Sequence, residues 1–185
     1  MKIPNTSLSD FSEVSLDPFQ HSIDERGSFY KIVDLTRVEI QTSYDQLKSF
    51  AVSTTKKMGS IRGIHFQTEP FAEKKIVACL QGKSFHVIVD LRDHSKTLGQ
   101  WFSVVLDENS PLALHLPVGV AHGFQTLEHS TKIFYAISAN YSPENAFSIN
   151  PFDLKLAINW PLAVSNISDR DKSGITIAEA ISLNG

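Results

Sequence analysis

The sequence predicts an all-β protein, an antiparallel sandwich or barrel, on three observations. Most apolar residues fall in short runs that alternate with polar residues, which is the period of a half-buried strand. Turn-forming residues separate these runs, and no strong helical pattern lies between them, so neighbouring strands are expected to pair antiparallel. The length of 185 residues, with 42% hydrophobic and 20% charged residues, fits a single domain over residues 1–185.

Four runs carry the strand signal most clearly, namely residues 84–91, 101–106, 112–116 and 132–137. Turn chemistry falls between them, as at residues 107–111 and 117–119. Weaker helical patterns are expected at 36–47 and 175–183. Two sheets curled around a cleft would leave a pocket lined by alternate strand residues. The phenylalanines expected to line the barrel are Phe66, Phe85, Phe124 and Phe134.

Composition argues against several classes of protein. The single cysteine, Cys79, cannot form an intrachain disulfide or begin a cysteine-based zinc site. The net charge of −3, without any Lys/Arg run longer than two, argues against nucleic acid as a main partner. No apolar stretch is long enough to span a membrane and no signal peptide pattern opens the sequence, so a cytoplasmic protein without a membrane partner is expected.

Chemistry-bearing side chains gather in three clusters at predicted strand ends or turns. The clusters are residues 62–67 with Lys75, residues 116–124, and Tyr135 with residues 141–143 and 168–171. His65 has apolar or small neighbours, which would hold a neutral imidazole near pH 7 and suit a general base. The alternative is a buried histidine whose ring nitrogens form hydrogen bonds inside the core. A distant carboxylate such as Asp171 would fix the tautomer of a basic His65.

Four further side chains each have a functional and a structural interpretation. His122 faces a ligand from its Pro-x-Gly-x-Ala-His-Gly-Phe turn or bonds local carbonyls. Lys75 meets an anion inside the barrel or lies on the surface, and Tyr135 is a cleft acid or a core residue. Arg62 grips a phosphate or is a surface charge. Strict alternation puts Arg62 and His65 on opposite faces, so both reach one pocket only if the strand ends or bulges between them.

Motifs for metals, nucleophiles and nucleotide loops are missing from the sequence. No two histidines stand at i and i+2, and nothing in their spacing brings His65, His86, His115 and His122 together. Neither Gly-x-Ser-x-Gly nor a glycine-rich phosphate loop occurs. No metal and no cofactor are therefore expected.

As an ordered set, these clusters resemble the dTDP-4-dehydrorhamnose 3,5-epimerase family, a cofactor-free branch of the cupin-like β-barrels. Each motif is weak alone, but together they run in order from about residue 15 to 172. The matching stretches are residues 24–27, 61–67, 75–82, 89–92 with Ser95, 99–101, 116–124, Tyr135, 141–143, 159–161 and 168–171. The resemblance implies a cupin-like jelly-roll barrel with a few short peripheral helices and a C-terminal tail over residues 173–185.

The resemblance also implies an activity in deoxysugar biosynthesis, epimerisation of a nucleotide-linked 4-keto-6-deoxy sugar at C3, C5 or both. His65 would be the base, held by Asp171, Lys75 would stabilise the enolate oxygen, and Tyr135 would return a proton from the opposite face. Family members are homodimers that exchange an N-terminal strand, so Arg26 and Phe29 are expected to serve the neighbouring subunit's site. The implied substrate contacts are Arg26, Phe29, Arg62, Gln67, His86, His122 and Asn140.

Some positions depart from the family pattern and leave the substrate open. Phe50 and Val52 replace a polar pair, Lys31 replaces an acidic residue, His86 replaces an aspartate, and Asn140 replaces an aromatic residue. A C5-only epimerase of a CDP-linked 3,6-dideoxy-4-keto sugar therefore remains an alternative. So do a 3,4-ketoisomerase, a non-catalytic nucleotide-sugar binder and a metal-dependent cupin.

Overall fold

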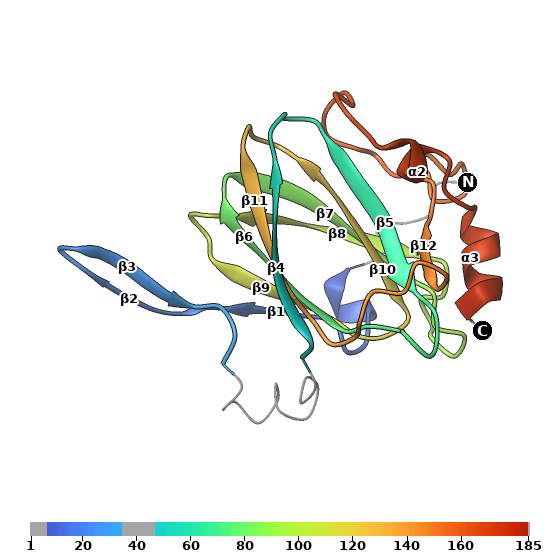
Figure 1. The fold of residues 1–185 in the computed structure, drawn as a ribbon, viewed down its shortest axis with the longest axis horizontal. Coiled ribbons are helices and arrows are strands. Elements are labelled where there is room, and N and C mark those ends of the chain that lie inside the picture. Colours follow the sequence, from blue (N-terminus) through green and yellow to red (C-terminus); the bar gives the residue numbers. More distant parts are fainter. Residues whose placement is uncertain (1–6, 35–46, 185) are drawn as a thin grey trace.

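Two five-stranded antiparallel sheets face each other and form a barrel (Figure 1). The computed structural model describes residues 7–34 and 47–184. The first sheet has the order β1-β9-β6-β11-β4 and the second the order β12-β5-β10-β7-β8. The first sheet consists of β1 (Ser15–Pro18), β9 (Leu112–Leu116), β6 (Lys75–Gln81), β11 (Thr131–Ile137) and β4 (Ser49–Thr55). The second consists of β12 (Ala146–Ser148), β5 (Ile61–Gln67), β10 (Val120–Thr126), β7 (Lys83–Asp90) and β8 (Trp101–Asp107).

Within residues 7–34 and 47–184 the helices are few and short, and they lie at the periphery of the barrel (Figure 1). They are the 3-10 turn η1 (Leu8–Asp10), α2 (Asp169–Lys172) and α3 (Ile177–Asn184). The all-β prediction is confirmed, as are the four predicted strands and the C-terminal helix. The helix expected at 36–47 lies outside the described residues apart from its last position. No helix in the described ranges is long and apolar enough to cross a membrane.

The barrel has one core inside and a second layer outside the β12-containing sheet. Interior side chains alternate along facing strands, as the period-two pattern predicts, and include Val77, Ile88, Leu114, Phe124 and Ile133. The opposite face of β7 is also largely buried, because apolar side chains between Ile149 and Ile181, including those of α3, pack over it. Most of β7 is therefore buried on both faces.

The positions of the four phenylalanines only partly match the prediction. Phe124 lies in the interior core. Phe66 is among the residues that line the cavity described below, but its ring packs in the outer layer and stacks on Phe147 at 5.7 Å. Phe85 packs outside, against Trp160, at a ring distance of 6.0 Å. Phe134 lies on the outer face of the other sheet and stacks on Phe50. Alternation of apolar and polar residues identifies the two faces of a strand. It does not show which of these faces is covered by another segment of the chain.

A bulge in β5 settles the position of Arg62 relative to His65. His122 of β10 pairs with His65, whereas Phe124 pairs with Arg62, so two residues of β5 oppose one residue of β10. Gly63 allows this geometry, since its φ is +104° and an added Cβ would lie 2.7 Å from the Gly123 Cα. Arg62 and His65 consequently line the same cavity, and of the two expected alternatives, a strand end or a bulge, the structure has the bulge.

The hairpin of β2 (Gln20–Asp24) and β3 (Gly27–Lys31) projects away from the barrel (Figure 1). Arg26 lies in the turn between these two strands and forms an ion pair with Asp24 of the same hairpin at 2.6 Å. Phe29 is 66% exposed, and Ile23 is 68% exposed. Neither Arg26 nor Phe29 lines the cavity of its own barrel.

Candidate active site

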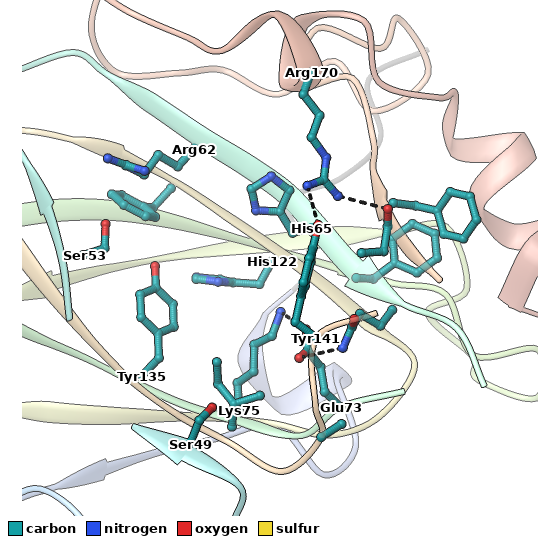
Figure 2. Close-up of a pocket in the computed structure, with 17 residues that line it drawn as sticks. Ser49, Ser53, Arg62, His65, Glu73, Lys75, His122, Tyr135, Tyr141 and Arg170 are labelled. Atoms are coloured by element: carbon teal, nitrogen blue, oxygen red, sulfur yellow. Dashed lines mark hydrogen bonds and ion pairs between the residues drawn. The ribbon is translucent and has the colours of Figure 1, made fainter. Parts of the chain in front are cut away.

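A cavity of about 320 Å³ lies between the two sheets (Figure 2). The β5–β10 wall supplies His65 and His122, and the opposing wall of β6 and β11 supplies Lys75 and Tyr135. The predicted residues therefore converge although they are spread over 70 positions of the chain. A concave site with a few convergent polar groups on an apolar lining is typical of small-molecule binding.

His65 and Asp171 form a hydrogen-bonded dyad. The His65 Nε2 lies 2.6 Å from the Asp171 Oδ1. Asp171 is 4% exposed and also accepts hydrogen bonds from the Ser148 hydroxyl at 3.0 Å and the Gly63 amide at 3.2 Å. The Ser168 hydroxyl caps α2 by accepting from the Asp171 amide, which fixes the carboxylate behind β5.

The charge state of Asp171 determines which nitrogen of His65 can act as a base. Burial raises the pKa of Asp171, but the hydrogen bonds from His65, Gly63 and Ser148 outweigh it and hold the pKa at about 2. An ionised carboxylate only accepts, so the His65 Nε2 carries a proton and donates it. The Nδ1 lone pair is then available to a ligand.

Lys75 and Tyr135 point into the cavity from the wall opposite His65 (Figure 2). Tyr135 packs beside Ile133 on β11, and its ring lies 6.4 Å from that of His122. Burial raises the pKa of the Tyr135 phenol above its usual value, so it stays protonated near neutral pH. Lys75 is buried, and its Nζ lies 2.7 Å from the Glu73 Oε1.

His122 lines the cavity and is held from behind by His86. The His122 Nε2 lies 2.8 Å from the His86 Nδ1, and the His86 Nε2 lies 2.8 Å from the Ser84 hydroxyl. His86 is completely buried and does not line the cavity. The substrate contact predicted for His86 does not match this placement, because His122 stands between it and the cavity.

This histidine pair should make the free energy of unfolding fall on mild acidification. Burial lowers the pKa of His86 from 6.5 to about 3, and it lowers the pKa of His122 too. Between pH 6.5 and about 3, His86 of the unfolded chain binds a proton that folded His86 does not. The free energy of unfolding is therefore lost as the pH falls from 6.5 towards 3. At pH 5 the loss from His86 is roughly 2 kcal/mol.

His86→Gln tests this expectation through urea unfolding at pH 7.5 and pH 5, at one protein concentration. The variant should lose roughly 2 kcal/mol less than the wild type between the two pH values. Asp171 does not interfere, since its lowered pKa of about 2 removes stability only as the pH falls below about 4. Equal pH dependence in both proteins would show that folded His86 does bind the proton.

Two arginines face the cavity from its rim. The Arg62 Nε donates to the Thr55 hydroxyl at 2.9 Å, and Arg170 donates to the Tyr141 hydroxyl at 3.1 Å and the Ala146 carbonyl at 3.0 Å (Figure 2). Both arginines also line a second cavity of about 330 Å³ on the Asp171 side of β5. Together they form a cationic edge suited to an anion.

Gln67 and Asn140, two of the predicted substrate contacts, are not free to bind a ligand in the way predicted. Gln67 lines the cavity, but it is 4% exposed and donates to the Asn140 carbonyl and accepts from the Ser142 amide. The Asn140 side chain does not line the cavity, whereas its neighbours Ala139 and Tyr141 do. Gln67 therefore shapes the rim loop.

Sequence reasoning missed several polar residues of the cavity. Glu73 stands two positions before Lys75 and would share its face if the strand began two residues earlier, but the strand begins at Lys75. Arg170 adjoins the predicted Asp171, and Tyr141 lay in a noted motif without an assigned role. Ser53 carried no signal, yet its buried hydroxyl lines the cavity and has no hydrogen-bond partner among the described residues.

Metal ligands do not cluster in the described part of the chain. Residues 7–34 and 47–184 contain no group of three or more His, Cys, Asp or Glu side chains placed to hold an ion. The two histidine contacts at the cavity are instead a histidine–carboxylate dyad and a histidine–histidine pair.

The chain is similar to several characterised proteins. It is 40% identical over 128 residues, 69% of this chain, to a dTDP-4-dehydrorhamnose 3,5-epimerase of Sinorhizobium fredii. It is 38% identical over 122 residues, 66% of this chain, to a dTDP-4-dehydrorhamnose 3-epimerase of Streptomyces niveus. The aligned parts cover 66% and 59% of these relatives, less than two thirds of their length.

Similarity to a solved structure extends over nearly the whole chain. The Legionella pneumophila dTDP-6-deoxy-D-glucose-3,5-epimerase, solved in complex with dTDP-4-keto-L-rhamnose, superposes with a TM-score of 0.84 at 32% identity. The match covers 97% of this chain and 96% of that one. A family model described as dTDP-4-dehydrorhamnose 3,5-epimerase matches residues 5–179. The protein therefore belongs to the dTDP-4-dehydrorhamnose 3,5-epimerase family.

Proposed function

We propose that the protein epimerises a nucleotide-linked 4-keto-6-deoxy sugar at C3, C5 or both. The observation that carries the proposal is the placement of a His65–Asp171 dyad and a protonated Tyr135 on opposite walls of one cavity. A base and an acid on opposite faces of a bound ring are what inversion of a carbon centre requires.

The reaction follows from these positions. The ketone at C4 acidifies the hydrogens on C3 and C5. The His65 Nδ1 takes one of these protons, the C–H electron pair forms a C=C bond to C4, and the C4=O4 π pair moves onto O4, which gives an enolate. The Lys75 ammonium stabilises the enolate oxygen. The Tyr135 hydroxyl then protonates the carbon from the opposite face, so the centre is inverted, and exchange with solvent restores both groups.

The rest of the cavity accounts for binding. Arg62 and Arg170 suit the diphosphate, and His122 and the unpartnered Ser53 hydroxyl suit sugar oxygens. Relatives include a 3,5-epimerase and a 3-epimerase, so membership of the family does not decide which carbon is inverted. A nucleotide diphosphate is too highly charged to cross a bilayer unaided, which supports a cytoplasmic site of action where its precursors are made.

The proposal also includes a homodimer, in which the β2–β3 hairpin of one chain reaches the other. The projecting β2–β3 hairpin carries Arg26 and the exposed apolar side chains of Phe29 and Ile23, none of which packs into its own barrel. Reaching a second copy would bury this apolar surface and bring Arg26 to the partner's diphosphate. This arrangement implies that each cavity is shared by two chains.

Solvent exchange tests the proposal directly. The enzyme is incubated in D₂O with TDP-, CDP- and GDP-linked 4-keto-6-deoxyglucose and the products are followed by NMR. Deuterium should enter at C3 or C5 with inversion for at least one nucleotide. A keto group moved to C3 would instead identify a 3,4-ketoisomerase. Saturable binding without exchange for every nucleotide would reduce the protein to a binder and overturn the proposal.

A further inference from the structure

The cavity holds a carboxylate, Glu73, to which the proposed reaction gives no role. Glu73 lies just before β6 and lines the cavity together with Lys75 (Figure 2). Its Oε1 lies 2.7 Å from the Lys75 Nζ, and both side chains are about 90% buried, at 12% and 10% exposure. Its Oε2 accepts a hydrogen bond from the Gln67 Nε2 at 3.1 Å.

Gln67 fixes this carboxylate to the frame of the barrel. Gln67 ends β5, is 4% exposed, and donates also to the carbonyls of Phe71 and Asn140. Its own carbonyl accepts from the Ser142 amide at 2.8 Å. The chain of contacts Gln67–Glu73–Lys75 therefore runs from the sheet that carries His65 to the one that carries Lys75.

A lysine needs such an anchor more than the other groups of the cavity do. Its ammonium sits on a flexible four-carbon stem, whereas the rings of His65, His122 and Tyr135 are rigid. The other charged or titratable groups facing the cavity are Tyr141 and, at the rim, Arg62 and Arg170. The cross-strand neighbours of Lys75 are the apolar residues Leu116 and Ile137, so Glu73 is the carboxylate of the cavity lining that lies within reach of its ammonium.

We propose that Glu73 is a positioning residue that holds the Lys75 ammonium in place against the enolate oxygen. The inference rests on the proposed function, because it assumes that Lys75 meets an enolate. Glu73 acts through Lys75 and does not itself exchange a proton with the sugar. A small displacement of a group that stabilises developing charge lowers turnover more than it weakens ground-state binding.

A double-mutant cycle tests the coupling. Glu73→Gln keeps the shape and the contact to Gln67 but removes the charge. It should lower kcat about 10-fold with KM changed less than about 2-fold. In a Lys75→Met background the same substitution should change kcat less than about 2-fold, because the group through which Glu73 acts is gone. Glu73→Asp, shorter but charged, should recover part of the loss.

A matched control is Glu69→Gln, an exposed residue of the same loop, which should leave kcat unchanged. Thermal unfolding of each variant identifies any loss of fold, and if Glu73→Gln does not fold, Glu73→Asp carries the test. Equal effects of Glu73→Gln with and without Lys75, or a rise in KM alone, would overturn the inference while the proposed function stands. Absence of deuterium exchange by the wild type would overturn both.

Discussion

His65→Ala should lower the rate of deuterium incorporation at the sugar ring by about 10²–10⁴-fold, the usual contribution of a positioned general base. In the proposed mechanism the Nδ1 of His65 removes the carbon-bound proton, and no other described residue of that wall is equivalent. His122 lies beside it, but its Nε2 contacts His86, and burial lowers its pKa well below the usual value. A weakly basic imidazole is a poor substitute for His65.

The measurement is the initial rate of deuterium uptake by NMR at saturating substrate. The variant should stay folded, because Asp171 keeps its hydrogen bonds from Gly63 and Ser148. His94→Ala, at an exposed turn residue, serves as the matched control and should exchange at the wild-type rate. Exchange by His65→Ala within a factor of about three of the wild type would remove His65 from the base position.

Tyr135→Phe should separate the two half-reactions. The substitution removes the hydroxyl that we propose as the proton donor, so formation of the inverted sugar should fall by about 10²–10⁴-fold. The proposed base, His65, is kept, so the enolate should still form and take up a solvent-derived deuteron on its original face. Recovered substrate should therefore be labelled at its original configuration while little inverted product accumulates.

Both signals are read from one NMR experiment, so substrate labelling is the internal control for folding and binding. The substitution removes a single oxygen from a buried ring that packs beside Ile133 and His122. If labelling and inversion fall together by the same factor, Tyr135 acts before or during deprotonation. Its assignment as the acid of the second step would then be wrong.

The strand pattern was readable from the sequence because its period is a local property. The same locality explains what the sequence did not reveal. The outward positions of Phe85 and Phe134 depend on which segments cover each sheet, and the place of His86 depends on the pairing of β7 with β10. The register in which two distant strands pair cannot be predicted from the spacing of apolar residues within either strand.

The site itself was recovered unevenly for a related reason. A strand end or a bulge between Arg62 and His65 was needed to bring both to one face, and the structure has the bulge. Glu73 precedes the strand that carries Lys75, so the strand pattern did not assign it to a face. Arg26 and Phe29 stand on a hairpin that points away from its own cavity, so one chain cannot reveal what they contact.

The dyad joins residues 106 positions apart, and this separation has a kinetic consequence. Contacts at such sequence separation are slow to form, because loop-closure entropy is lost before the contacts stabilise the fold. The segment that carries Asp171 also lies outside both sheets, so the sheets do not need it in order to pair. The barrel strands can pair before residues 166–177 close over β5. Until they do, His65 has no carboxylate to select its tautomer. During refolding, the return of catalysis should therefore lag behind the return of β structure, and the length of that lag reports the docking of α2.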